Sequence, residues 1–119
     1  MSFPLSLVTK IAQIAHAADR VYVTTLGEES LPIWTKLSEE QQAAVIAKVN
    51  YQLDNPLFAD SGIHNQWAAE QEAAGWTYGR EYDADAKTDP KIKSFHLLPV
   101  ELQTKDRLFA AIVKALSRV

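Results

Sequence analysis

The sequence of 119 residues contains no cysteine, which excludes disulfide bonds, thiolate chemistry and zinc sites built on cysteine. It also lacks an excess of positive charge. The formal net charge is −3, so no overall basic field attracts nucleic acid. No apolar run is long enough to cross a membrane. The first residues, MSFPLSLVTK, carry no basic region ahead of an apolar run. We therefore expect no signal peptide and a location in the cytoplasm, or in the host's cytoplasm if the protein is viral.

Patterns that mark enzymes are missing as well. The sequence has no nucleophile elbow, no P-loop and no glycine-rich dinucleotide turn. It has no H-x-x-x-H pair or carboxylate cluster typical of a metal site. Three histidines and many carboxylates permit acid–base chemistry in principle, so an enzyme of unrecognised type stays an alternative. We expect a protein without catalytic activity, metal or cofactor.

What the sequence does contain predicts a folded domain. Hydrophobic residues make up 47% of the chain and charged residues 23%, a balance typical of globular proteins and unlike disordered ones. The length suits one domain over residues 1–119, and no internal repeat or linker interrupts it.

Apolar residues at helical spacing predict a first helix over residues 5 to about 25, and Gly27 lies where this helix would stop. Ser38 followed by Gln41 resembles a capping box, which would open a second helix. Asn55-Pro56 would close that helix, because the residue before a proline avoids helical dihedral angles.

A third helix is predicted from a cap at Asp60 or Ser61 to about Ala74, and Gly75 would end it. The fourth helix carries Pro99 in its first turn, where proline is tolerated, and lines one face with apolar residues as far as Leu116.

The third and fourth helices are joined by residues 75–90, GWTYGREYDADAKTDP. The glycines and the proline in this segment indicate irregular chain. Tyr78, Tyr82 and the nearby glycines could form a short, twisted hairpin, although the alternation of apolar and polar residues is poor. The predicted fold class is therefore mainly α. We expect a compact domain of four helices around one core, with a short β-hairpin or irregular segment between helices three and four.

Several short motifs, taken in order and spacing, resemble the ryanodine-receptor (RyR) domain family. In the first half they are His16-x-x-Asp19-Arg20-x-Tyr22, Leu26-Gly27 and Pro32-x-Trp34. In the second half they are His64-x-x-Trp67, Gly75-Trp76-x-Tyr78-Gly79, Lys87-Thr88-x-Pro90, Leu98-Pro99 and Lys105-Asp106-x-x-Phe109. The resemblance spans roughly residues 8–116 and suggests a stand-alone single repeat of bacterial or phage origin.

This resemblance implies a largely α-helical fold with short strands in the Gly-Trp-x-Tyr-Gly region. It also implies a binding module, neither a channel nor an enzyme. In the tandem repeats of the channels, a cleft between two related repeats accepts an adenine nucleotide, and the tryptophan that matches Trp67 lies at that cleft. Prokaryotic members have been suggested to sense nucleotide-derived signals in conflict between bacteria and phages. A sensor or a sequestering protein is therefore the expected role.

The candidate ligand-binding residues are Trp67, His64, Trp76, Tyr78, Arg80 and Lys87. An indole face can stack on a purine, and Trp67 and Trp76 could frame one cleft. His64 lies one helical turn from Trp67 and could donate a hydrogen bond. Arg80 and Lys87 are cations suited to phosphate. Two alternatives stay open: these residues could pack in the core or be solvated, or the aromatics could form a protein–protein interaction surface.

Two positions depart from the family pattern. Many members carry a basic residue where this chain has Tyr82, and many carry histidine where it has Asp89. Together with the neighbouring acidic residues, these departures make the segment less suited to a polyphosphate. They put in doubt that this chain binds the same ligand as its relatives.

The remaining motif residues are predicted to be structural: His16, Asp19, Arg20, Tyr22, Trp34, Lys105, Asp106 and Phe109. The first three are expected to form a polar network on or beneath the first helix. Lys105 and Asp106, beside Phe109, are expected to form an ion pair that fixes the last helix against the hairpin.

The expected partner is a small molecule, an adenine nucleotide or a cyclic-nucleotide-type signal. Because tandem repeats face one another about an approximate two-fold axis, a single repeat could recreate that arrangement as a symmetric homodimer. Each subunit would then offer Trp67 to a shared cleft. The Gly75–Gly79 segment is expected to be buried on one side by helices three and four and to border the ligand groove on the other.

Overall fold

The computed structural model describes residues 3–56 and 61–118, and these ranges are mainly helical. Four α-helices run in the order α1 (Leu5–Thr25), α2 (Glu39–Asp54), α3 (Gly62–Ala73) and α4 (Val100–Leu116). Two short 3-10 helices, η1 (Trp34–Lys36) and η2 (Phe95–Leu97), lie in the connections. The predicted mainly-α fold is confirmed. No helix within these two ranges is both long and apolar enough to cross a bilayer.

The predicted helix ends at Gly27 and Gly75 are confirmed. Both glycines adopt a left-handed conformation, with φ of +81° and +93°. Gly27 N–H donates to the Thr24 carbonyl at 3.0 Å, and the next residue, Glu28, donates to the Val23 carbonyl at 3.1 Å. This is the hydrogen-bond pattern of a Schellman motif, which satisfies the last carbonyls of α1. The end of α3 has the same pattern, since Gly75 donates to Glu72 and Trp76 donates to Gln71.

The helix starts lie where the sequence predicted them, although one predicted cap residue makes no side-chain capping hydrogen bond. Ser38 and Gln41 form the predicted capping box, with both reciprocal hydrogen bonds present. Pro99 lies directly before Val100, the first residue of α4. Ser61 occupies the cap position of α3, but its hydroxyl makes no capping hydrogen bond. Asp60, the alternative cap, lies outside the described residues.

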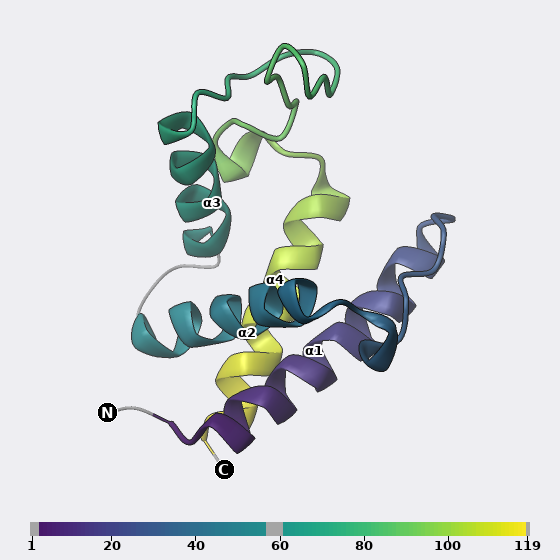
Figure 1. The fold of residues 1–119 in the computed structure, drawn as a ribbon, viewed down its shortest axis with the longest axis vertical. Coiled ribbons are helices and arrows are strands. Elements are labelled where there is room, and N and C mark those ends of the chain that lie inside the picture. The colour runs from purple at the N-terminus through teal and green to yellow at the C-terminus, as the bar shows by residue number, and fades with distance from the viewer. Residues whose placement is uncertain (1–2, 57–60, 119) are drawn as a thin grey trace.

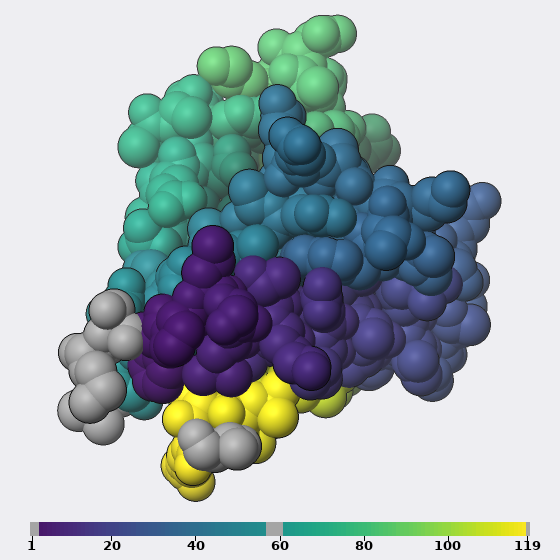
Figure 2. Space-filling view, turned by 60° about the horizontal axis from the view of Figure 1, so that its bottom comes forward, coloured from purple at the N-terminus to yellow at the C-terminus, as the bar shows by residue number. Residues whose placement is uncertain are grey.

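The main core is formed by α1, α2 and α4. Its most buried members are Val8, Ile11, Ala12, Val49 and Val113, each at most 1% exposed. Figure 1 shows α2 crossing in front of α4, with the start of α1 beside the end of α4. From below, α1 lies between the chain around the start of α2 and the end of α4 (Figure 2). Among the described residues, no member of this cluster comes from α3. The sequence had suggested four helices around one core. The structure instead forms this core from three helices, α1, α2 and α4.

α3 instead packs on the chain that leads into α4. The two buried residues of α3 are His64 and Ala68. His64 Nε2 lies 2.8 Å from the Lys93 carbonyl oxygen, and its ring centroid lies 6.2 Å from that of buried Phe95. As a result α3 stands beside the body of the other helices, with the irregular loop that follows Gly75 beyond its end (Figure 1).

The connection between α1 and α2 is fixed by two side chains of α1. His16 Nε2 lies 2.7 Å from the Pro32 carbonyl oxygen, and Arg20 Nε donates to the Leu31 carbonyl at 2.8 Å. Trp34 meets the His16 ring edge-on at 6.0 Å between centroids and packs against the core. Further along α1, Tyr22 donates its hydroxyl hydrogen to the Glu101 carbonyl at 2.9 Å, which joins the end of α1 to the start of α4.

Residues 75–90 form an irregular loop and not a hairpin. Their only regular pairings in the described chain are isolated bridges, Thr77 with Thr88 and Asp83 with Thr88. The Asp83 carboxylate accepts from the N–H groups of Asp85 and Ala86, so it caps a tight turn. Both pairings involve Thr88. Gly79 lies so close to Thr88 that a Cβ at this position would be 2.5 Å from Thr88 Cβ.

A groove between α2, α3 and α4

A groove of about 680 Å³ opens between α2, α3 and the first half of α4. This volume lies within the range of roughly 300–1,000 Å³ that is usual for small-molecule sites. Its walls combine aromatic and aliphatic side chains with lysines and carboxylates. The lining residues are Ala44, Ala47, Lys48, Tyr51, Ile63, His64, Gln66, Trp67, Glu70, Lys91, Leu98, Leu102, Lys105 and Asp106.

Trp67 is the largest planar side chain in the groove. It is half-buried on α3, and its ring centroid lies 5.6 Å from that of His64 at an interplanar angle of 35°. Lys91 Nζ lies 5.6 Å from the centroid of the same indole, which is a cation–π contact. One flat side chain therefore has a fixed aromatic neighbour and a cation over its ring.

His64 positions this wall of the groove. A carbonyl oxygen can only accept, so the Nε2 atom that faces the Lys93 carbonyl must carry the hydrogen. The ring is 7% exposed and lies between Trp67 and Phe95. Its Nε2 hydrogen is thus already used within the protein, whereas the sequence had suggested His64 as a donor to the ligand.

A chain of side-chain hydrogen bonds crosses from α2 to α3 at the rim. The Tyr51 hydroxyl donates to Gln66 Oε1 over a long distance of 3.4 Å, and Gln66 Nε2 donates to Glu70 Oε1 at 2.9 Å. Trp67 lies between Gln66 and Glu70 in the sequence of α3. These bonds therefore hold the turn of α3 that carries the indole against α2.

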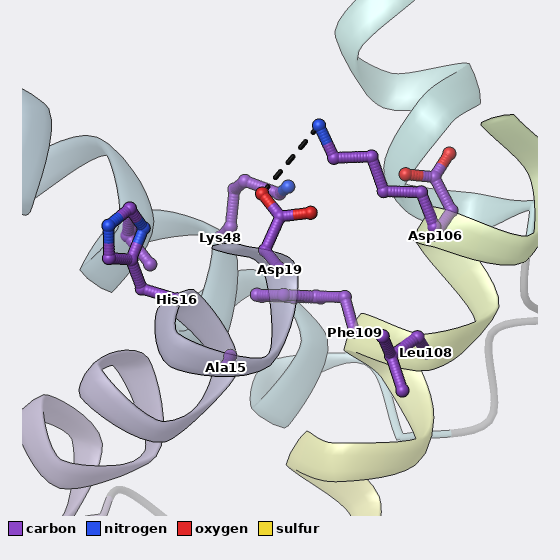
Figure 3. Close-up of a pocket in the computed structure, with 9 residues that line it drawn as sticks. Ala15, His16, Asp19, Lys48, Asp106, Leu108 and Phe109 are labelled. Atoms are coloured by element: carbon purple, nitrogen blue, oxygen red, sulfur yellow. Dashed lines mark ion pairs between the residues drawn. The ribbon is translucent and has the colours of Figure 1, made fainter. Parts of the chain in front are cut away.

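Charged residues from three helices meet at the other end of the groove. Lys105 Nζ lies 3.6 Å from Asp19 Oδ2, and this ion pair connects α4 to α1. The sequence had predicted that Lys105 and Asp106 would pair against the hairpin; instead Lys105 reaches across to α1. Lys48, Lys105 and Asp106 line both the groove and a crevice of about 60 Å³ beneath it. Figure 3 shows Asp19 and Lys48 close together, Asp106 to their right on α4, and the ion pair to Asp19 as a dashed line.

Burial perturbs two of these groups in opposite directions. It raises the pKa of the Asp106 carboxyl above its ordinary value of 3.8, and the nearby Lys48 ammonium only partly counteracts this shift. It lowers the pKa of Lys48 below 10.5, again with partial compensation from Asp106. Lys48 as a whole is exposed, and its ammonium lies 4.5 Å from the centroid of the Phe109 ring. Neither charge is therefore fully compensated by its neighbours.

The other predicted ligand-binding residues, Trp76, Tyr78, Arg80 and Lys87, do not line this groove. The left-handed Gly75 turns the chain away from the face of α3 that carries Trp67, so the two tryptophans do not frame one cleft. Trp76 packs on Tyr82, with 5.6 Å between ring centroids. Tyr78 is 53% exposed, so the expected burial of the Gly75–Gly79 segment by α3 and α4 does not extend to this ring.

Lys87 has a local structural role. Its Nζ donates to the Ala74 carbonyl at 3.1 Å, at the C-terminal end of α3. A cation at this end is favoured by the helix dipole. Lys87 itself adopts a left-handed backbone, with φ of +56°, which is uncommon for a residue with a side chain.

The two departures from the family pattern also have structural explanations. Tyr82 supplies the ring that packs on Trp76. Asp89 is 5% exposed, and its Oδ1 accepts from the Lys91 N–H at 2.9 Å. Both side chains stabilise the loop and neither lines the groove.

Sequence reasoning missed Lys48 and Tyr51 on the groove's α2 side. A signal was available, because Ala44, Ala47, Lys48 and Tyr51 recur at helical spacing. This second face lies beside the apolar face that carries Val49. Its mixed composition resembled an ordinary solvated surface.

Comparison with known proteins identifies one family. A family model described as the RyR domain matches residues 56–118, just over half of the chain. The match includes α3, the irregular loop and α4, and hence Trp67, Lys91 and Lys105. The motifs of residues 16–34 and the α2 side of the groove lie outside it. A search of curated proteins finds no significant match.

Proposed function

The chain belongs to the RyR-domain family, and from this premise we propose that it is a non-catalytic module that binds a nucleotide or nucleotide-derived signal in the groove. The wider role would be that of a sensor, or of a protein that sequesters the signal, in conflict between bacteria and phages. The expected ligand combines a planar ring with an anionic group.

The observation that supports this proposal is the presence of Trp67 and three lysines, Lys48, Lys91 and Lys105, along one groove. Stacking of a base on an aromatic side chain contributes roughly 1–3 kcal/mol. The cation–π contact that Lys91 now makes with Trp67 is worth about 0.5–1 kcal/mol at an exposed site. A base can therefore displace Lys91 from the indole with a net gain, and the released ammonium can then meet the ligand's anion.

Calorimetry against a panel of nucleotides tests this proposal. Trp67→Ala should weaken binding by about tenfold or more, since a full stacking contribution is lost. Trp76→Ala is the matched control, because Trp76 is also a half-buried indole but does not line the groove. It should leave the affinity nearly unchanged. If Trp67→Ala remains folded and binds as well as the parent protein, the stacking proposal is wrong.

A symmetric homodimer is the second part of the proposal. It would bring two copies of Trp67 to a shared cleft, as in the tandem repeats that the family resemblance suggests. Light scattering with and without nucleotide measures the assembly. A protein that stays monomeric at high concentration in both conditions would exclude the shared cleft, while the groove within one chain would remain a candidate site.

A protein–protein interaction module is the second candidate function. Large apolar side chains are exposed on the loop, in η2 and at the start of α4: Tyr78 at 53%, Tyr82 at 65%, Leu97 at 69% and Val100 at 63%. Exposed aromatics of this kind often anchor interfaces. Pull-down of a partner that is lost on Tyr78→Ala and retained on Trp67→Ala would favour this function over nucleotide binding.

A further inference from the structure

Lys105 is shared between two environments. Its side chain lines the groove and also the crevice beneath it, where it faces Asp19 on α1. The distance of 3.6 Å to Asp19 Oδ2 is longer than the roughly 2.7–2.9 Å of a charge-assisted hydrogen bond. The Lys105 side chain is 39% exposed and that of Asp19 is 28% exposed. The pair is therefore loose and open to exchange with another anion.

Lys48 supplies a second cation at the same end of the groove. Its nearest ring is Phe109, with the ammonium 4.5 Å from the ring centroid. Asp106 also lines this end but offers only partial compensation, because burial disfavours its ionised form. An added anion would relieve the burial cost of the Lys48 charge.

Asp19 differs from the other three charged groups because it lines the crevice but not the groove. A ligand in the groove therefore meets Lys48, Lys105 and Asp106, while Asp19 holds Lys105 from behind. Two lysines suit a phosphoryl group, which carries more charge than a single carboxylate.

We propose that the groove ends in a phosphoryl subsite formed by Lys48 and Lys105, and that Asp19 competes with the ligand's phosphoryl group for Lys105. This inference rests on the proposed function, since it places the anionic end of a ligand whose ring stacks on Trp67. It places the ligand's anionic group at lysines of α2 and α4, whereas the sequence had suggested Arg80 and Lys87 as the cations that bind it. It also predicts that α1 influences the affinity for the ligand through Asp19, which contacts Lys105.

Calorimetry with paired probes tests the inference: adenosine with AMP, and guanosine with GMP. The parent protein should bind a nucleotide about tenfold more tightly than its nucleoside, and Lys105→Gln should remove most of that difference. Asp19→Asn should strengthen nucleotide binding by about two- to fivefold, the range expected for a partly exposed ion pair, and leave nucleoside binding unchanged.

Two controls separate competition from a general change of charge. Glu28→Gln removes one negative charge from an exposed residue just beyond α1 and should not alter either affinity. In the Lys105→Gln background, Asp19→Asn should give no gain, because the cation for which Asp19 and the phosphoryl group compete is absent.

The outcomes distinguish this inference from the proposed function. Equal affinity for nucleoside and nucleotide would overturn the phosphoryl subsite and leave stacking on Trp67 intact. A gain from Asp19→Asn that persists without Lys105 would overturn the competition. If no nucleoside or nucleotide binds the folded parent protein, both the proposed function and this inference are wrong.

Discussion

Replacement of His64 by phenylalanine should destabilise the protein, although the new ring is of similar size. The imidazole of His64 is 7% exposed and provides the Nε2 hydrogen for the Lys93 carbonyl at 2.8 Å. Phenylalanine can keep the ring contacts with Trp67 and Phe95 but cannot donate this hydrogen bond. The carbonyl would then be left without its partner in a partly buried site.

The expected loss is about 1–3 kcal/mol, the cost of leaving a buried acceptor unsatisfied. A cavity contribution should be small because the ring volume is retained. With a denaturant dependence of about 2 kcal/mol per molar urea, in the middle of the range for small proteins, the unfolding midpoint should fall by about 0.5–1.5 M. Unfolding should be close to two-state for a single domain of this length, so the midpoint can be converted into a free energy.

The assay is urea unfolding at 25 °C, followed by circular dichroism and tryptophan fluorescence. His96→Phe is the matched control, since His96 is exposed and its ring only meets Phe95 edge-on at 5.4 Å. It should change the free energy of unfolding by less than about 0.5 kcal/mol. Equal stability of the two variants would refute the idea that the His64 hydrogen bond holds α3 against the following chain. A stable His64→Phe variant that loses nucleotide affinity would instead favour a direct contact between His64 and the ligand.

Three further predictions concern stability. Burial raises the pKa of Asp106 above 3.8, so the folded protein holds this proton more tightly than the unfolded chain, and stability from this group falls as the pH rises between the two pKa values. Relative to the parent, Asp106→Asn should therefore become more stable as the pH rises above the ordinary value of 3.8, measured by urea unfolding; a difference that is flat with pH would contradict the shift. Gly79→Ala should destabilise the loop by about 1–3 kcal/mol because its Cβ would lie 2.5 Å from Thr88 Cβ, and a melting temperature equal to the parent's would contradict that close approach. Ile11→Ala, at a position 1% exposed, should cost about 2–5 kcal/mol in the same unfolding assay, and a loss below about 1 kcal/mol would mean that the site collapses around the gap.

The helix boundaries could be predicted because they depend on nearby residues. The capping box of Ser38 with Gln41, and the left-handed glycines Gly27 and Gly75, act within a few residues of the helix ends that they define. The start of α3 was harder, since Ser61 is a residue type that often caps but makes no such bond here.

The groove could be predicted only in part, because it joins residues that are distant in sequence. Trp67 and His64 share a face of α3, and helical spacing was enough to link them. Lys48 and Lys105 meet at one end only because α2 and α4 pack together, which no local pattern reports. Lys87 and Trp76 were assigned to the ligand because of their chemistry, but their positions are fixed by contacts with Ala74 and Tyr82.

The composition of the main core has a consequence for where the chain could be cut. Among its most buried members, Val8, Ile11, Ala12 and Val49 precede the region matched by the family model, and only Val113 lies within it. A recombinant fragment limited to residues 56–118 would thus expose the apolar face of α4 and should be largely unfolded by itself. Supplying residues 3–56 as a separate peptide should restore helical structure through fragment complementation. We therefore expect the stretch that the family model matches to be shorter than the unit that folds by itself.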